Sequence, residues 1–318
     1  SKKVGTLKAK TIGVYFSVIS DVMRNQKSSE QEEKNLMGQS RKNIQSSPIM
    51  PEDVAGSLRL GDAKWDSDGE TLVWLEGRSG QGVLVVKGPG ETPRDLTGDL
   101  NVHAEVGYGG GDFTVSGGHA YFVLKGSGRI YRLGLEGGKP VAITPDFGRS
   151  AAMTVSPCGQ WLLYVHHDDG EDRLAVVDTE GRHWPRILSE GWDFYMQPRW
   201  SRCGERIAWI SWNHPNMPWD GSVLHCGKVL VDGEVLPTLE GVEALDGAGD
   251  VSVFQPEFSE DGESLYYVSD REGFGQIWNV VIETGSRTRL TFDQEEYGQP
   301  AWVQDLRTYA LIDGSNQA

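Results

Sequence analysis

The stretch MTVSPCGQWLLYVHHD, Met153 to Asp168, contains the pattern that decides the fold. An apolar segment ends at the short Ser-Pro-Cys-Gly sequence, and a second apolar segment, WLLYV, begins directly after it. Serine hydrogen-bonds the local backbone in turns, and glycine accepts a positive φ without steric cost. The stretch therefore predicts two antiparallel strands joined by a tight turn.

Five other stretches repeat this phrase. They are KWDSDGETLVWLE from Lys64, FTVSGGHAYFVLK from Phe113, PRWSRCGERIAWIS from Pro198, PEFSEDGESLYYVSDREG from Pro256 and PAWVQDLRTYALIDG from Pro300. Taking Trp65, Phe113, Val155, Trp200, Phe258 and Trp302 as equivalent anchors gives separations of 48, 42, 45, 58 and 44 residues. A repeat of about 40 to 50 residues is typical of β-propeller blades.

A second pair of strands is expected after each hairpin, because a blade has four strands. The candidates are GVLVVKG, RIYRLGLEGGKPVAIT, RLAVVDTEGRHWPRIL and QIWNVVIETGSRTRLTF. After the last hairpin copy only SNQA remains, which would leave a sixth blade without its outer strands. We therefore predict an all-β fold, a propeller of five blades plus an incomplete sixth, over residues 47–318.

Residues 1–46 differ sharply in composition from the rest. They contain nine Lys or Arg and four Asp or Glu, whereas the whole chain has a net charge of −16. With few apolar residues after the first twenty, this segment cannot offset the entropy of ordering, so we predict a basic, loosely ordered N-terminal extension. A basic amphipathic membrane anchor is the alternative interpretation.

Charge and cysteine usage exclude several classes of function. The strong negative charge disfavours nucleic acid as a partner. No apolar run approaches the roughly 20 residues of a membrane-spanning helix, so no membrane span is expected. Cys158, Cys203 and Cys226 have no CxxC spacing, and we interpret them as reduced thiols of a cytoplasmic protein, the first two as turn residues in separate blades.

Several segments together resemble a known family. They are WNHPNMPWDG from Trp212, GYGGGDF from Gly107, GWDFYMQPRWS from Gly191, FQPEFSEDGESLYYVSDREG from Phe254 and SPIMPEDVAGSLRLGDAKWD from Ser47. From about Ser47 onward the chain is similar to the N-terminal, TolB-like propeller of prolyl oligopeptidase family serine peptidases. The closest branch is the acylaminoacyl-peptidase or dipeptidyl-aminopeptidase-like one, and WNHPNMPWDG is the most diagnostic segment.

The resemblance implies a function in proteolysis. In that family the propeller lies over an α/β-hydrolase domain and restricts access to a Ser-His-Asp site, so the implied partners are this hydrolase domain and peptides. The 318 residues contain no nucleophile elbow G-x-S-x-G, since Ser79 and Ser150 each lack the second glycine. We therefore expect no catalytic residue, no metal and no cofactor in the chain, and no peptidase activity of the chain alone. It resembles a fragment that ends before the hydrolase domain. A stand-alone protein-interaction module is the alternative.

The candidate functional segment is WNHPNMPWDG. Its two prolines cannot donate to a strand ladder, so it should be a connection between two strands, made stiff by its tryptophans. We interpret it as a loop that contacts either the hydrolase domain or the substrate. Its residues are Trp212, Asn213, His214, Pro215, Asn216, Pro218, Trp219 and Asp220.

Three other motifs favour structural roles. HHDDGED, His166 to Asp172, is interpreted as a hairpin loop rather than a metal site, and GYGGGDF as close backbone packing near the propeller axis rather than a phosphate loop. The adjacent Glu295 and Glu296 do not match the context of the paired acids of dipeptidyl peptidases, so that role is not transferred. A sialidase-type propeller remains a minor alternative, because the turn spacing differs by one residue.

Overall fold

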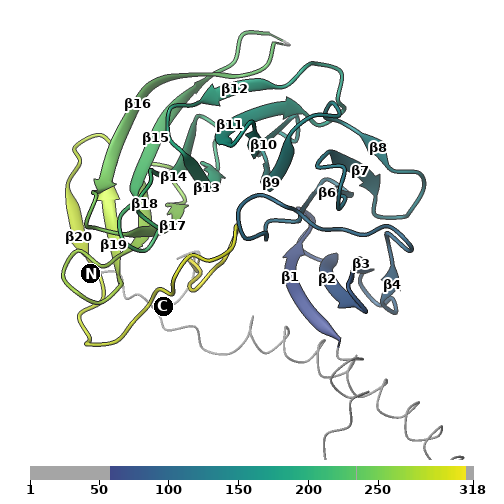
Figure 1. Ribbon diagram of the computed structural model, residues 1–318, viewed down its shortest axis with the longest axis horizontal. Coiled ribbons are helices and arrows are strands. Elements are labelled where there is room, and N and C mark those ends of the chain that lie inside the picture. Colours follow the sequence, from purple (N-terminus) through teal and green to yellow (C-terminus); the bar gives the residue numbers. More distant parts are fainter. Residues whose placement is uncertain (1–57, 234, 313–318) are drawn as a thin grey trace, which may run out of the picture. The chain divides into compact units, whose positions relative to one another are not determined.

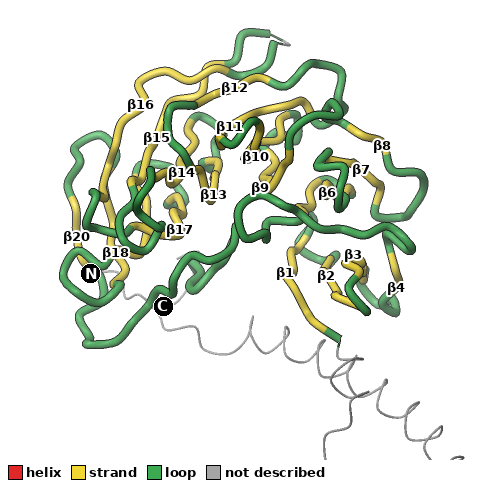
Figure 2. The backbone as a smooth tube through the Cα atoms, viewed as in Figure 1, coloured by secondary structure: helices red, strands yellow, loops and turns green. Residues whose placement is uncertain are grey.

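The structure is a computed structural model that describes residues 58–233 and 235–312, and every regular element in these ranges is a β-strand (Figures 1 and 2). All of the strands belong to one compact unit, Ser57–Tyr309. The described part of the chain accordingly has no helix long and apolar enough to cross a membrane. The predicted basic extension, residues 1–46, lies outside the described residues.

Five four-stranded antiparallel sheets follow one another, each made of strands consecutive in sequence. The first sheet contains β1 (Arg59–Trp65), β2 (Leu72–Arg78), β3 (Gln81–Lys87) and β4 (Arg94–Asp95). The second contains β5 (Phe113–Ser116), β6 (His119–Val123), β7 (Ile130–Gly134) and β8 (Val141–Ala142). The third contains β9 (Arg149–Val155), β10 (Trp161–Asp168), β11 (Glu171–Asp178) and β12 (Arg186–Ser189).

The last two sheets repeat the same four-stranded pattern. The fourth contains β13 (Phe194–Trp200), β14 (Arg206–Trp212), β15 (Val223–Leu230) and β16 (Thr238–Gly247). The fifth contains β17 (Val253–Phe258), β18 (Ser264–Ser269), β19 (Gln276–Val281) and β20 (Arg287–Arg289). Each predicted second pair of strands is therefore confirmed.

One turn joins the first and second strands in four of the five sheets. In each, a glycine N–H donates to the carbonyl three residues earlier over 2.8 to 3.0 Å, and the glycine φ lies between 70° and 75°. These glycines are Gly69, Gly159, Gly204 and Gly262. Because such a φ strongly favours glycine, the sequence repeat and the structural repeat coincide. Cys158 and Cys203 lie in the turns of the third and fourth sheets as free cysteines, as predicted.

The sheets are blades arranged around a common centre. The first strands β1, β5, β9, β13 and β17 lie next to one another in this order, and Figure 1 shows the blades following an arc from β1 to β20. The apolar core lies between neighbouring blades: one cluster joins the first and second, one the second to fourth, and one the fourth and fifth. The predicted all-β propeller fold is confirmed.

Three of the innermost strands contain the same irregularity. Their pairing with the second strand shifts at a residue with positive φ, and these residues are Ala152 (54°), Gln197 (52°) and Gln255 (51°). Such a bulge re-aims side chains and frees backbone groups from the ladder. In the fourth and fifth blades, the residue so placed is a fully buried glutamine.

The segment after β20 differs from the expected sixth blade. Within the described residues, 299–309 forms no strand, and its one bridge is between Gln304 and Gly110. Its backbone and side chains bond to the innermost strands instead of pairing as a hairpin. The anchor Trp302 accordingly lies in no strand, and Phe113 begins β5, whereas the other four anchors end theirs.

Candidate functional site

The segment WNHPNMPWDG is the connection between β14 and β15, as predicted. Because strands alternate in direction, this connection lies at the same end of the blades as the start of β13, and Phe194 pairs with Trp212 across the two strands. The connections from one blade to the next also lie at this end. The candidate loop is therefore part of one face of the propeller, which we call the entry face.

The start of the loop is fixed by aromatic packing and by Asp193. Trp212 is buried and stacks on Phe194 with ring centroids 5.1 Å apart, and His214 lies edge-on to Phe194 at 4.8 Å. The backbone N–H of Asp193 donates to Asn213 Oδ1 over 2.7 Å, and Asp193 Oδ2 accepts from the backbone N–H of His214 over 2.8 Å. The loop thus leaves the blade in one defined direction.

The tip of the loop is fixed by short-range and long-range hydrogen bonds. Asp220 Oδ2 accepts from the backbone N–H of Met217 over 2.9 Å, which closes the turn. Asn216 Nδ2 donates to the carbonyl of Gly249 over 2.6 Å and ties the loop to the connection before the fifth blade. Pro215 is exposed, whereas Pro218 is buried. These contacts fix the position of the loop, which the sequence predicts to be stiff.

Three aromatic side chains from separate segments meet beside this loop. Trp219 lies 4.3 Å from Trp302, and Trp302 lies 5.6 Å from Tyr108 between ring centroids. Tyr108 is 67% and Trp302 52% exposed. We call Tyr108, Trp219 and Trp302 the aromatic rim. Because large exposed aromatics are favoured at binding surfaces, the rim is suited to apolar contact with a partner.

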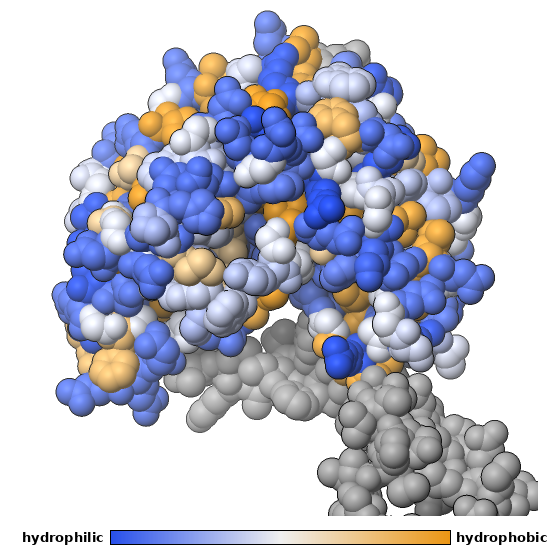
Figure 3. Space-filling model, viewed as in Figure 1, coloured by the Kyte–Doolittle hydropathy of each residue, from blue (hydrophilic) through white to orange (hydrophobic). Residues whose placement is uncertain are grey.

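Elsewhere the view in Figure 3 shows a surface that is mainly hydrophilic, with apolar side chains scattered singly or in small groups. Within the described ranges, no three His, Cys, Asp or Glu side chains come together so that they could hold a metal ion. HHDDGED forms the hairpin between β10 and β11, where His167 Nδ1 lies 2.7 Å from Asp172 Oδ1. Burial raises the pKa of Asp172.

GYGGGDF packs closely against neighbouring backbone, as predicted. A Cβ on Gly110 would lie 2.5 Å from the carbonyl oxygen of Gln304, and one on Gly111 would lie 2.5 Å from the backbone nitrogen of Ala152. Such distances exclude any side chain at these two positions. The glycines therefore allow the chain to pass close to both β9 and the segment after β20.

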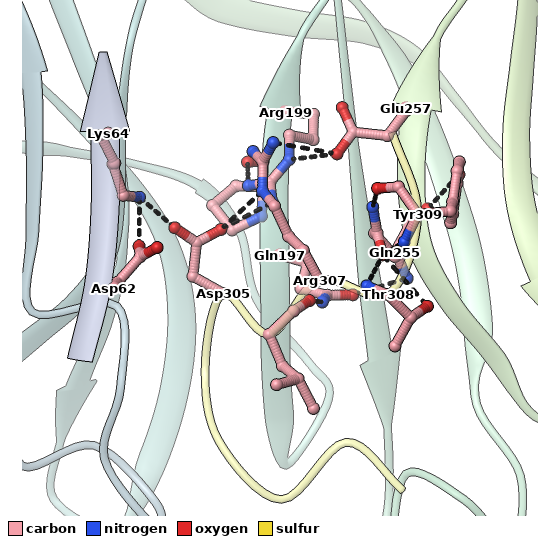
Figure 4. A network of polar contacts seen from close by, with 12 residues as sticks. Asp62, Lys64, Gln197, Arg199, Gln255, Glu257, Asp305, Arg307, Thr308 and Tyr309 are labelled. Carbon is pink, nitrogen blue, oxygen red and sulfur yellow. Dashed lines mark hydrogen bonds and ion pairs between the residues drawn. The ribbon is translucent and has the colours of Figure 1, made fainter. Parts of the chain in front are cut away.

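A second polar cluster was not predicted from the sequence. Figure 4 shows Lys64 on β1, Arg199 on β13 and Glu257 on β17 directed toward Asp305 and Arg307 of the last segment. A signal for it does exist: Lys64, Arg199 and Glu257 each directly precede an aromatic anchor. Since side chains alternate along a strand, the residue before the anchor points the opposite way, toward the centre.

Asp305 is the most enclosed member of this cluster. Arg199 Nη2 donates to Asp305 Oδ1 over 2.6 Å, and Lys64 Nζ forms an ion pair with Asp305 Oδ2. Burial alone would raise the pKa of Asp305, but the charges of Lys64, Arg199 and Arg307 outweigh it and hold the pKa well below its ordinary value. The carboxylate is therefore ionised and fully paired.

Solved structures of peptidases and of TolB share this fold. A puromycin-hydrolysing peptidase of Mycobacterium tuberculosis is 27% identical with a TM-score of 0.75, over 84% of this chain and 44% of its own. A puromycin hydrolase is 26% identical with a TM-score of 0.74, over 82% and 43%. TolB from Acinetobacter baumannii is 17% identical with a TM-score of 0.53, over 75% and 55%, and supports the propeller fold alone.

Two curated relatives match about half of the chain. An uncharacterised protein of Agrobacterium fabrum is 27% identical over 180 residues, 54% of each chain, and a TolB homologue of Chlorobium luteolum is 25% identical over 174 residues, 54% of this chain and 36% of its own. No family model matches the chain. The chain thus spans about half the length, or less, of the relatives it matches. It carries a β-propeller of the kind found in the puromycin-hydrolysing peptidases of the prolyl oligopeptidase family.

Proposed function

We propose that this propeller is the noncatalytic, substrate-gating part of a prolyl oligopeptidase-like serine peptidase of the acylaminoacyl-peptidase or dipeptidyl-aminopeptidase-like branch. The observation that carries the proposal is the similarity to puromycin-hydrolysing peptidases over 84% of the chain. The 318 residues contain no G-x-S-x-G, so chemistry would come from an α/β-hydrolase domain and the propeller would limit which peptides reach it. Three free cysteines fit a reducing, cytoplasmic location.

The candidate loop is the proposed contact with the hydrolase domain. It lies on the entry face, where the chain passes from blade to blade, and its hydrogen bonds hold it in one conformation. A preordered loop binds a partner without a large ordering cost. Trp219, with the rest of the aromatic rim, supplies the apolar part of that contact, while Asn213, His214 and Asp220 are exposed and supply polar groups.

A chimera tests this function. Residues 58–312 would replace the matching propeller of the Mycobacterium tuberculosis puromycin-hydrolysing peptidase. The chimera should hydrolyse short aminoacyl fluorogenic substrates but not casein, because the propeller would exclude large substrates sterically. The isolated chain should show no turnover and no labelling by a serine-hydrolase probe. A folded chimera that cleaves casein as readily as short peptides, or a labelled isolated chain, would refute the proposal.

A stand-alone interaction module is the second candidate. The observation in its favour is the aromatic rim, which exposes two large rings on one face. In that case, the chimera would not assemble into an active enzyme, whereas the isolated chain would bind a protein partner through the rim. Trp302→Ala should then abolish partner binding without changing the far-ultraviolet circular dichroism.

A further inference from the structure

Residues 304–309 run through the space enclosed by the innermost strands, and we call them the axial segment. The backbone N–H of Gln304 donates to the carbonyl of Gly109 over 2.8 Å, on the approach to the second blade. Gln304 Nε2 donates to the carbonyl of Tyr195 on β13 over 2.9 Å. Figure 4 shows Asp305 between Lys64 on β1 and Arg199 on β13, and Thr308 and Tyr309 beside Gln255 on β17. The axial segment therefore touches four of the five blades or their connections.

Two glutamines hold the axial segment by its backbone. Gln197 Nε2 donates to the carbonyl of Leu306 over 2.8 Å. Gln255 Oε1 accepts from the backbone N–H of Thr308 over 2.7 Å, and Gln255 Nε2 donates to the carbonyl of Tyr309 over 2.7 Å. These bonds do not depend on the side chains of residues 306, 308 and 309. They would therefore hold another peptide that adopts the same backbone conformation in the same register.

The two glutamines form one unit. The backbone N–H of Gln255 donates to Gln197 Oε1 over 2.7 Å, and both residues are fully buried with φ near +50°. A positive φ at a residue other than glycine costs about 1 to 2 kcal/mol. Strain of this kind persists where the surroundings enforce it and is concentrated at binding sites. In this backbone conformation, the side-chain amides of Gln197 and Gln255 both point toward residues 306–309.

One carboxylate is recognised through charge. Arg199 and Lys64 come from the fourth and first blades, and both contact Asp305. Arg199 is buried, and its other acidic partner, Glu257, lies 3.5 Å away. Without the carboxylate of Asp305, Arg199 would keep only Glu257 and Lys64 only Asp62 as an acidic partner, and the loss of a partner from a buried charge is unfavourable. The centre of the propeller thus favours an acidic group from the segment that fills it.

We propose that the innermost strands of the first, fourth and fifth blades form a binding site for a peptide that carries an aspartate, and that the axial segment occupies this site in cis. The glutamine amides bind the peptide backbone, and Lys64 with Arg199 selects the carboxylate. A peptide from another chain enters the site only when the axial segment leaves it. The inference does not depend on a hydrolase domain. It can therefore fail while the proposed gating function holds, and the gating function can fail while this inference holds.

The experiment separates the segment from the propeller in the folded protein. A seven-residue protease cleavage sequence would be inserted between Gly298 and Gln299, outside the strands, and cut after purification. A fluorescein-labelled peptide of residues 300–312 is then titrated by anisotropy. Saturable binding to the cut protein is expected, displaced by unlabelled peptide, with binding to the uncut protein at least about tenfold weaker because its site is filled.

Matched variants identify the contacts. The peptide with Asp305→Asn needs no change in the protein and should bind at least about tenfold more weakly, since it loses a buried charge pair. In the protein, Lys64→Met should weaken binding, while Lys125→Met, at an exposed lysine, should not. No saturable binding to the cut protein would overturn the proposal, and would favour a place for the segment in a further blade. Equal affinity of the Asp305→Asn peptide, or equal binding to cut and uncut protein, would overturn it too.

Discussion

Asp305 is held by two cations that come from different blades, and this makes a single carboxylate a link between elements far apart in sequence. Lys64 on β1 precedes Asp305 by 241 residues, and Arg199 on β13 precedes it by 106 residues. Each ion is removed from water, which costs free energy that only good pairing offsets. Removing the charge of Asp305 without changing the shape of its side chain should therefore lower the free energy of unfolding.

Asp305→Asn should destabilise the protein by about 3 to 5 kcal/mol, because it breaks a buried pair and leaves charge uncompensated. The free energy of unfolding in urea measures this. Asp99→Asn at an exposed position is the control and should change stability by less than about 0.5 kcal/mol. Equal effects of the two substitutions would show that residue 305 is not buried among cations.

His225 should make stability depend on pH. It is buried against Trp209, shares a 2.7 Å hydrogen bond with Ser211, and burial lowers its pKa to about 4. Between pH 6.5 and about pH 4, the unfolded chain binds a proton at this residue that the folded chain does not, so stability falls as the pH falls. The loss reaches about 3 kcal/mol at pH 4.

Comparison with His225→Gln isolates this effect, since the other titrating groups remain. Urea unfolding at pH 7 and at pH 4.5 should show a smaller loss of stability on acidification for His225→Gln than for the unchanged protein. A loss of the same size in both would mean that His225 titrates normally and is not buried.

At the scale of elements, the β14–β15 loop divides its two tryptophans between structure and surface. Trp212 is 7% exposed and stacks on Phe194, so Trp212→Ala should cost about 3 to 5 kcal/mol. Trp219 packs on the exposed ring of Trp302, so Trp219→Ala should cost only about 1 kcal/mol. Thermal unfolding of the two variants measures the difference. The reverse order would mean that the loop is anchored by its tip rather than by its start.

The connection before β5 should depend on the absence of a side chain at one position. Gly111 and Gly117 have similar φ values of 62° and 59°, but only Gly111 would place a Cβ against the backbone of Ala152. Gly111→Ala should therefore destabilise the protein by several times as much as Gly117→Ala, which costs about 1 kcal/mol from the conformation alone. Chemical denaturation of both variants gives the comparison, and equal costs would contradict the close packing.

At the scale of the whole molecule, the sequence predicts the blades well because their signals are local. A Ser-x-x-Gly turn between two apolar strands requires a glycine at positive φ, and Gly159, Gly204 and Gly262 all supply it. The same reasoning placed the β14–β15 connection correctly, because Pro215 and Pro218 cannot take part in a strand ladder.

The central cluster escaped prediction because its contacts join segments far apart in sequence. Residues 300–312 have the pattern of a blade hairpin, yet in the structure the glutamines of β13 and β17 bind this backbone. A local pattern describes what a segment can pair with, but not which partner is nearest once the blades have assembled. The charged residues before the anchors, Lys64, Arg199 and Glu257, are the sequence feature that would have indicated an acidic partner.

Hydrogen exchange of the intact chain, followed by mass spectrometry, tests the central claim most directly: five radial blades enclose residues 304–309. The amides of Gln304 and Thr308 donate to Gly109 and Gln255, so peptides covering 304–309 should exchange as slowly as those from β13. Exchange of these peptides at the rate of an unstructured chain, with β13 still protected, would contradict the account.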